Sequence, residues 1–170
     1  MLLKSNIYMA EIMKPYTMDE LRAAVNCSEK IIGRNVYRVN MRVASKFVGY
    51  SYRAEHEQRM GRAVQRKANV PDVYGAELLD GNWYSMMQFI NGVPIAKTIG
   101  NGNHEATGLR DAEILKILDL GIVPFGCFHP YNALVTPDKM VFLIDFELWD
   151  YGSEADIRSH RKKLLKQHFE

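Results

Sequence analysis

Two side chains that carry oxygen atoms, Asn132 and Asp145, have a spacing that could serve a metal ion. They stand thirteen residues apart, and each lies beside a short apolar run typical of a β-strand. If the two runs pair as a hairpin, an amide oxygen and a carboxylate come to the same end of it. Mg²⁺ prefers oxygen ligands of this kind. The spacing therefore predicts a metal site at Asn132 and Asp145, and the alternative is a turn asparagine and an aspartate that bind no metal.

The composition indicates one ordinary globular domain, or two small lobes that share a core. The chain has 170 residues, of which 47% are hydrophobic and 25% charged, as in folded proteins. A net charge of +2 gives no indication of a nucleic-acid partner. Cys27 and Cys127 stand far apart, which fits a reducing compartment, although a disulfide stays open. No apolar run approaches the roughly 18 residues of a membrane span, and the first residues lack a signal-peptide segment, so we expect a soluble cytoplasmic protein.

The first half of the chain should contain short antiparallel strands between two helices. Thr17 and Glu20 have the spacing of a capping box, which predicts that a short helix begins there. Short β-rich runs predict an antiparallel meander over 30–48. A charged helix over 53–67 and a hairpin with an Asp80-Gly81 turn should follow it.

The second half of the chain should begin after a flexible stretch rich in glycine and asparagine over 92–108. Apolar residues at helical spacing predict a helix over 109–120, which Gly121 ends. The two strands that carry the metal candidates follow, and Ser153 opens a final helix whose Leu164 and Leu165 should face inward. The histidines of the charged or polar segments should lie at the surface; these are His56, His104, His160 and His168.

In this order of elements the chain resembles the protein-kinase-like superfamily, most closely its small aminoglycoside-phosphotransferase-like and fungal kinase-like members. The likeness is greatest over residues 120–147, LGIVPFGCFHPYNALVTPDKMVFLIDFE. It implies an α+β, two-lobed kinase-like fold within a single domain. The N-lobe, with an antiparallel sheet, would cover 17–91. A linker over 92–108 and a reduced, mainly helical C-lobe over 109–170 would complete it.

The same resemblance implies ATP and Mg²⁺ as cofactors and assigns residues to them. Lys46 would contact the phosphates, and Glu57 on the next helix would hold it as a fixed cation. Glu55 is the competing partner, but Glu57 precedes the inward-facing Met60 by three residues, which favours it. Backbone groups of residues 87–89 would pack the adenine; these are Met87, Gln88 and Phe89. The metal ligands would be the pair named above, Asn132 and Asp145.

Several departures from the family pattern point to a degenerate catalytic loop. No glycine-rich GxGxxG loop precedes the strand of Lys46. Gln88 stands where an acidic residue is common, and Phe125 replaces the catalytic-loop histidine. Cys127 stands five residues before Asn132, where the family has its aspartate base. Few residues follow Asp145, so the substrate-binding helices of larger relatives are mostly missing.

Cys127 therefore has three interpretations. It could be a small buried hydrophobic residue, the commonest situation of a free cysteine. It could form a nucleophile pair with His129, although residues two apart in a turn rarely converge and no third group orients them. It could also be a degenerate base position, because a thiol with a pKa of about 8.5 is a poor proton acceptor at neutral pH. The first and third interpretations are compatible, and we favour them together.

These observations lead to three hypotheses for function. The first is a pseudokinase-type protein that binds ATP and Mg²⁺ between the lobes, with phosphotransfer impaired by the loss of the aspartate base. The second is an active phosphotransferase on a protein or small-molecule hydroxyl group. The third is a scaffold without nucleotide, in which a protein partner or a second copy of the chain covers the short C-lobe. The sequence leaves open whether the protein is an enzyme.

Overall fold

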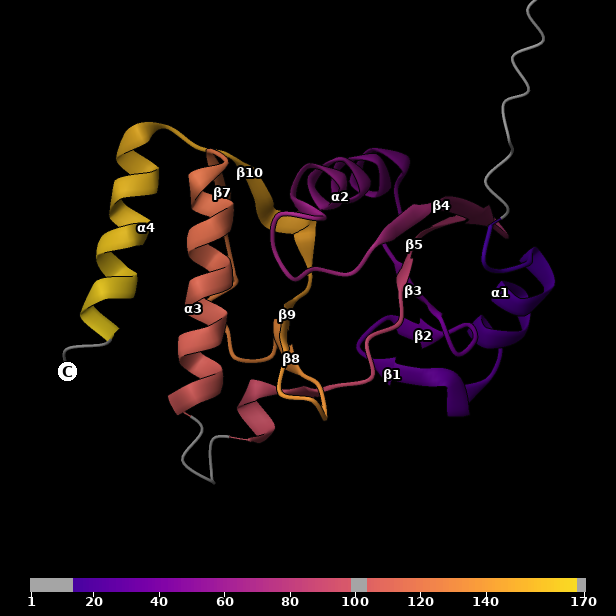
Figure 1. Cartoon of the computed structure of the whole chain (residues 1–170). Helices are drawn as coiled ribbons and strands as arrows, with labels where there is room; N and C mark the ends of the chain where they lie inside the picture. Colours follow the sequence, from indigo (N-terminus) through magenta and orange to yellow (C-terminus); the bar gives the residue numbers. More distant parts are fainter. Residues whose placement is uncertain (1–13, 99–103, 168–170) are drawn as a thin grey trace, which may run out of the picture.

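The computed structural model describes residues 14–98 and 104–167 and shows a mixed α+β fold with antiparallel sheets (Figure 1). The largest sheet has the strand order β1-β2-β3-β5-β4. Its strands are β1 (Ile31–Gly33), β2 (Val36–Arg38), β3 (Val43–Phe47), β4 (Val73–Leu79) and β5 (Asn82–Gln88). Two helices accompany this sheet, α1 (Met18–Val25) and α2 (Ser51–Val64). The meander predicted over 30–48 is confirmed, since β1, β2 and β3 pair antiparallel in sequence order.

The second half of the chain combines two helices with short strands. The helices are α3 (His104–Asp119) and α4 (Glu154–Gln167). One sheet pairs β7 (Ile122–Pro124) with β10 (Trp149–Tyr151), and the other joins β6 (Val93–Pro94), β8 (Ala133–Val135) and β9 (Val141–Leu143). A 3₁₀ turn, η4 (Phe146–Leu148), connects β9 to β10. Strands therefore accompany the helices here, whereas a mainly helical second half was expected.

Local sequence signals set several of these elements. The Thr17 hydroxyl accepts a hydrogen bond from the Glu20 backbone N–H at 3.2 Å, and the Glu20 carboxylate accepts one from the Thr17 N–H at 2.7 Å. This is the predicted capping box, and α1 begins at the next residue. Asp80 and Gly81 both have positive φ, 51° and 77°, as a two-residue hairpin turn requires. The β4–β5 hairpin therefore forms where the sequence predicted it.

Helix α2 lies between the large sheet and the second half of the chain (Figure 1). Ala54, Met60 and Val64 are fully buried, as their spacing predicted. At Gly61 the helix comes so close to β4 and η4 that an added Cβ would lie 2.5 Å from a side-chain carbon of Val73. The helix ends at Val64, three residues before the predicted end. Because α2 contacts both halves of the chain, it can position a side chain between them.

Two clusters of buried side chains form the core. The smaller one fills the space between α1 and the large sheet, with Leu21, Val43 and Met86 at its centre. The larger one extends from α2 through α3 to η4 and β10, and it includes Ile114 and Trp149. The region after Asp145 is therefore packed on the same core as α2.

Some predicted boundaries and exposures differ from the structure. Helix α3 begins at His104, five residues before the predicted start, and β6 and the 3₁₀ turn η2 (Ile95–Lys97) lie in the segment expected to be flexible. Residues 99–103 of that segment lie outside the described residues. Helix α4 begins after Ser153, whose hydroxyl accepts from the Asp156 N–H at 3.2 Å. Leu164 is buried as predicted, but Leu165 faces solvent and is 60% exposed.

The prediction that His160 lies at the surface is wrong. Its ring is buried between Phe125 and Phe128 of the loop that follows β7, with ring centroids 5.3 and 5.9 Å away. His56 is only half-buried, because its Nε2 lies 2.7 Å from the Trp149 carbonyl oxygen. His104 is exposed, and His168 lies outside the described residues, as does the terminal Phe169. No helix within 14–98 and 104–167 is long and apolar enough to cross a bilayer.

Candidate functional site

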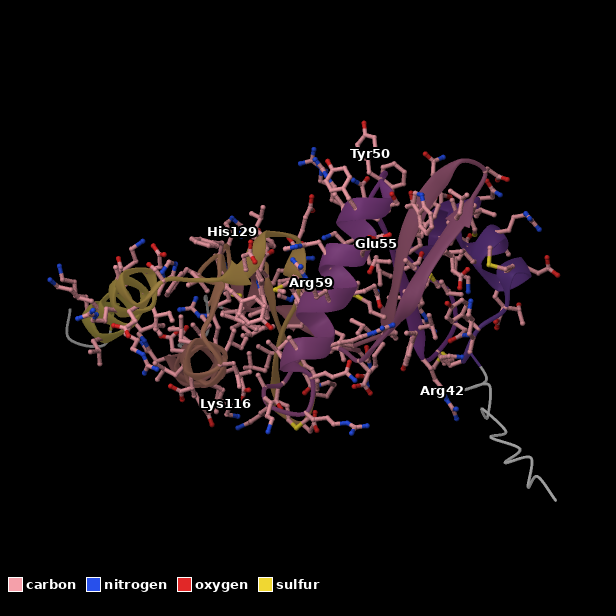
Figure 2. All side chains as sticks on the ribbon, turned by 90° about the horizontal axis from the view of Figure 1, so that it is seen from above. Arg42, Tyr50, Glu55, Arg59, Lys116 and His129 are labelled. Atoms are coloured by element: carbon pink, nitrogen blue, oxygen red, sulfur yellow. The ribbon has the colours of Figure 1, made fainter. Side chains whose placement is uncertain are left out.

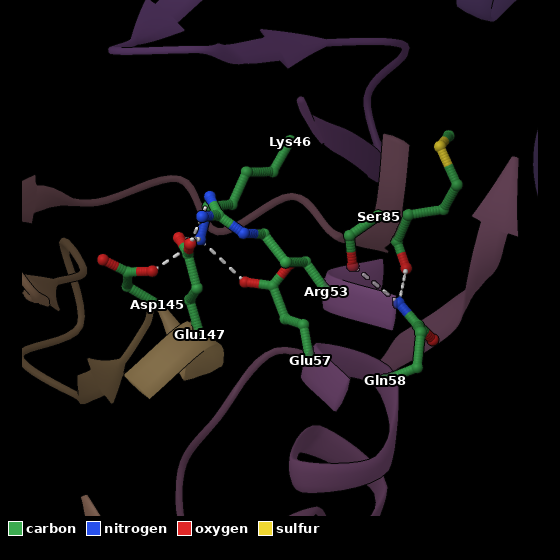
Figure 3. Close-up of polar contacts among 8 residues, drawn as sticks. Lys46, Arg53, Glu57, Gln58, Ser85, Asp145 and Glu147 are labelled. Atoms are coloured by element: carbon green, nitrogen blue, oxygen red, sulfur yellow. Dashed lines mark hydrogen bonds and ion pairs between the residues drawn. The ribbon is translucent and has the colours of Figure 1, made fainter. Parts of the chain in front are cut away.

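Lys46 is the centre of a cluster of charged side chains from three parts of the fold (Figure 3). It lies in β3, where it is opposite Val36 of β2 and Ser85 of β5. Its Nζ is 2.9 Å from Glu57 Oε1 of α2 and 2.5 Å from Asp145 Oδ1, which follows β9. These partners are 11 and 99 residues away in sequence. The fold therefore brings together the lysine, the glutamate and the aspartate that the sequence singled out.

Glu57 reaches Lys46 because it lies on the inward face of α2. Its side chain is 0% exposed, and it is one helical turn before the fully buried Met60. Glu55, the competing partner, is exposed on the other side of the helix. The spacing argument that favoured Glu57 over Glu55 is thus confirmed for the pairing with Lys46.

Burial and charge act on this pair in opposite directions. Burial raises the pKa of Glu57, and the nearby Lys46 ammonium only partly offsets that rise. Burial by itself would lower the pKa of Lys46, but the carboxylates of Glu57 and Asp145 outweigh it and leave the pKa above its usual value. Glu57 Oε2 makes no hydrogen bond of normal geometry to a described residue, although the Ser85 hydroxyl is near enough to oppose the rise. Lys46 is therefore a fixed cation at neutral pH, as the resemblance implied.

Asp145 and Asn132 meet at one end of the β8–β9 hairpin. Ala133 pairs with Leu143 in the register, and the Ile144 N–H donates to the Asn132 carbonyl at 3.0 Å, so Asp145 follows directly. Asp145 has a left-handed backbone, with φ of 72° and ψ of 75°. Such a conformation costs about 1–3 kcal/mol in a non-glycine residue and is often found at functional sites. The hairpin thus brings the two predicted metal ligands to the same end, as their spacing suggested.

The oxygen atoms of this pair suit a hard cation such as Mg²⁺. The Asn132 amide donates from Nδ2 to the Gly126 carbonyl at 3.2 Å, which leaves Oδ1 without a hydrogen bond from the described residues. Asp145 contacts Lys46 through Oδ1, and its side chain is 40% exposed. Within the described ranges no group of three or more His, Cys, Asp or Glu side chains could hold a metal by itself. The remaining ligands of a metal at this pair would have to be waters and oxygens of a bound molecule.

Sequence reasoning missed two members of the charged cluster, Glu147 and Arg53. Glu147 Oε2 is 3.4 Å from Lys46 Nζ, and its Oε1 is 3.1 Å from Arg53 Nη1 (Figure 3). Lys46 therefore has three carboxylates around it, and Glu147 is shared with a second cation. Both residues had a detectable signal: Arg53 is one helical turn before Glu57, and Glu147 is two residues after Asp145.

Cys127 lies in the core and not in the charged cluster. Its side chain is 0% exposed and belongs to the larger hydrophobic cluster. Burial raises the pKa of the thiol, and the Asp145 charge raises it further, so the thiol remains protonated. His129 is exposed, and no hydrogen bond between it and Cys127 is found among the described residues. These facts favour the buried-hydrophobe interpretation and contradict a Cys127–His129 nucleophile pair.

The backbone groups predicted to pack an adenine are already engaged in part. The Gln88 N–H donates to the Asp72 carbonyl at 2.7 Å, and the Phe89 N–H donates to the Arg42 carbonyl at 2.8 Å. Met87 is paired inside the sheet, with Ala44 on one side. The N–H groups of Gln88 and Phe89 are therefore engaged within the fold, and Met87 is paired on both sides of β5.

Neither a protein-family model nor any curated protein matches the chain in sequence.

Proposed function

We propose that this chain is a kinase-like domain that binds ATP with Mg²⁺ beside Lys46 and has lost efficient phosphotransfer. The observation that carries the proposal is the convergence of Glu57 and Asp145 on Lys46, from elements far apart in sequence. A lysine fixed by a buried glutamate beside a metal-ligand aspartate is the arrangement that polyphosphate binding requires in kinases. The antiparallel five-stranded sheet, α2, α3 and the β8–β9 hairpin follow the order of that fold, which supports the same proposal.

Each charged residue has a definite role in this proposal. Lys46 would neutralise phosphate oxygens, and Glu57 would hold its ammonium in place. Asn132 Oδ1 and the Asp145 carboxylate would hold Mg²⁺, which when bound neutralises negative charge on the phosphates. Asp145 and Glu147 contact Lys46 directly in this structure, so phosphate binding would replace part of these contacts.

The environment of Cys127 is the reason for proposing weak transfer. A general base must accept a proton at working pH, and it contributes about 10²–10⁴-fold to a rate. A fully buried thiol whose pKa is raised is protonated and cannot reach a substrate hydroxyl. The cluster can still bind a nucleotide, because binding uses Lys46 and the metal pair and not the residue at position 127.

Thermal unfolding with and without Mg·ATP tests the proposal. At a free ATP concentration a hundred times Kd, binding adds about 2.7 kcal/mol, which raises the Tm of a chain of this length by about 5–10 °C. Asp145→Asn removes the carboxylate charge while keeping its shape, and it should abolish the shift. Asp150→Asn is the matched control, since Asp150 is exposed on β10 and should leave the shift unchanged.

Two further arms define what is bound. ATP with EDTA should give a much smaller shift than Mg·ATP, and inorganic triphosphate with Mg²⁺ separates a phosphate site from a nucleotide site. No Tm shift at millimolar Mg·ATP, or an equal shift in Asp145→Asn, would refute the proposal. Metal-dependent transfer of the γ-phosphate to a hydroxyl substrate would instead identify an active enzyme. Cys127→Asp is a poor test of lost activity, because it puts a carboxylate into the core.

A further inference from the structure

An open cavity of about 540 Å³ lies between α2 and η4. Five of its lining residues belong to α2 and two to η4, and Glu57, which faces Lys46, is not among them. Its volume is within the range of small-ligand sites, about 300–1,000 Å³. None of the roles assigned above uses this cavity, although Arg53 and Glu147 belong to both the charged cluster and the cavity lining.

The cavity contains one cation that is available to an anion. Arg53 and Arg59 both line it, and Glu147 already pairs with Arg53 at 3.1 Å. Arg59 has no carboxylate partner among the described side chains, and its only described hydrogen bond there is from Nη2 to His56 Nδ1, at 3.1 Å. A guanidinium has five N–H donors, so Arg59 retains most of its capacity for a carboxylate.

The polar wall around Arg59 is held in one arrangement. Because a guanidinium can only donate, His56 Nδ1 accepts from Arg59, and Nε2 carries the proton that is donated to the Trp149 carbonyl at 2.7 Å. The neutral His56 ring thus links α2 to β10 and fixes one side of the Arg59 guanidinium. A prearranged donor loses less conformational freedom when a ligand binds.

Exposed apolar side chains adjoin the same cavity. Tyr52 and Leu148 line it, and they are 62% and 64% exposed. Tyr50 stacks on Tyr52 with ring centroids 5.7 Å apart, and Figure 2 shows Tyr50 at the start of α2, pointing away from the protein. Large exposed aromatic groups next to an available arginine are typical of sites where binding energy concentrates in protein interfaces.

From these contacts we infer that the cavity binds a short acidic peptide segment of a partner protein. A ligand carboxylate would bind Arg59, and an apolar side chain would pack on Tyr52 and Leu148. Glu55, exposed on the rim and without a cationic partner among the described residues, would accept peptide N–H groups. A nucleic acid fits poorly, because Arg59 can pair with one anionic group while Glu55 and Glu147 would repel the further phosphates of a polyanion.

Fluorescence anisotropy with labelled peptides tests this inference on the full chain. The probes are short peptides in which one acidic and one apolar residue are placed at every spacing in a Gly-Ser frame. Matched peptides carry lysine for the acid, and a labelled thymidine oligonucleotide serves as the polyanion. The inference does not depend on ATP, so the assay is run without nucleotide.

The expected result is saturable binding of acidic, apolar peptides only. Arg59→Gln should weaken it about tenfold or more, since a hydrogen bond to a charged group contributes about 1.5–3 kcal/mol. Tyr52→Ser should also weaken it. Arg62→Gln is the matched control, because Arg62 is exposed on α2 but does not line the cavity, and its Kd should stay within about twofold.

Three outcomes would overturn the inference. In the first, no acidic peptide binds at millimolar concentration. In the second, the lysine peptides or the oligonucleotide bind as tightly as the acidic peptides. In the third, Arg59→Gln and Arg62→Gln change the Kd of the acidic peptide by the same factor. All these positions are exposed, so each variant should keep the wild-type Tm. Any variant that does not is replaced by the peptide-side control with lysine for the acid.

Discussion

Replacing Lys46 by methionine should destabilise the protein by an amount that depends on pH. Methionine keeps most of the apolar volume of the side chain and removes the ammonium. Asp145 and Glu147 would lose a partner, but both are partly exposed and water can screen them. Glu57 is 0% exposed, so it would be left as an unpaired carboxylate in the core. Removal of one partner from a buried pair typically costs about 3–5 kcal/mol.

The magnitude can be worked out from the protonation of Glu57. Without Lys46, the most stable folded state is the one in which the Glu57 carboxyl is protonated. Against an unfolded pKa of about 4.3, protonation costs about 1.36 kcal/mol for each pH unit above it, hence about 1.0 kcal/mol at pH 5 and about 3.7 at pH 7. The pKa of Glu57 is raised in the folded state. The contribution of this carboxyl to folding stability is therefore fully present below pH 4 and is lost as pH rises toward the folded-state pKa. In the wild type, Lys46 opposes this loss.

Urea denaturation of four proteins between pH 5 and pH 7 measures the effect. Lys46→Met should lose more stability than the wild type between these pH values, by at most about 2.7 kcal/mol at 1.36 kcal/mol per unit, because the raised pKa of wild-type Glu57 already gives the wild type part of this loss. The double variant Lys46→Met/Glu57→Gln should not show this extra loss of stability with rising pH, because glutamine does not titrate. Lys67→Met is the control, since Lys67 is exposed. If Lys46→Met costs under about 1 kcal/mol at pH 7 and follows the wild-type pH profile, Glu57 does not depend on Lys46 and the reasoning fails.

Three other predictions follow from burial and packing. In the native protein a thiol reagent should modify Cys27 and spare Cys127 until denaturant is added, because Cys127 is buried and its pKa is raised, and early loss of both thiols would contradict this. In urea denaturation, Gly61→Ala should lower the free energy of unfolding by about 1–3 kcal/mol, because the new Cβ would lie 2.5 Å from a β4 side chain. Gly108→Ala should raise it by about 0.5–1 kcal/mol, because nothing lies within 4 Å of the new Cβ. The reverse order of stabilities would be inconsistent with the packing of α2. Burial and a neighbouring carboxylate raise the pKa of Tyr16. The contribution of this phenol to folding stability is therefore present below pH 10 and is lost as pH rises above that value. Tyr16→Phe should accordingly lose less Tm between pH 9 and pH 11 than the wild type.

The sequence predicted best what is decided by neighbouring residues. The capping box at Thr17 and the Asp80-Gly81 turn depend on backbone geometry within four residues, and both formed as predicted. The inward face of α2 was also predictable, because 3.6-residue spacing places Glu57 with Met60. That spacing decided between Glu57 and Glu55, whereas the choice of Lys46 as the partner came from the resemblance to the kinase-like family.

What the sequence could not predict depends on contacts between distant segments. His160 is buried because α4 packs its ring between two phenylalanines of the loop after β7, and no local pattern near His160 signals this. The N–H groups of Gln88 and Phe89 are engaged by residues 16 and 47 positions earlier. Glu147 is shared between Lys46 and Arg53, a contact that needs α2 and η4 side by side. Such contacts follow from tertiary packing, which cannot be derived from the periodicity of the sequence.

The loop after β7 belongs to the core, whereas the end of the β8–β9 hairpin carries the charged cluster. This difference supports the proposal of nucleotide binding without efficient phosphotransfer. Cys127 in the loop is part of the core, and Phe125 of the same loop contacts the buried His160 ring. A carboxylate at position 127 would add negative charge near Asp145, where three carboxylates already surround one lysine. A thiol avoids that repulsion and contributes to packing, while Asn132 and Asp145 still carry oxygen atoms at the end of the β8–β9 hairpin. Under the function proposed above, a thiol in place of an aspartate base suits this crowded cluster and the core beneath it.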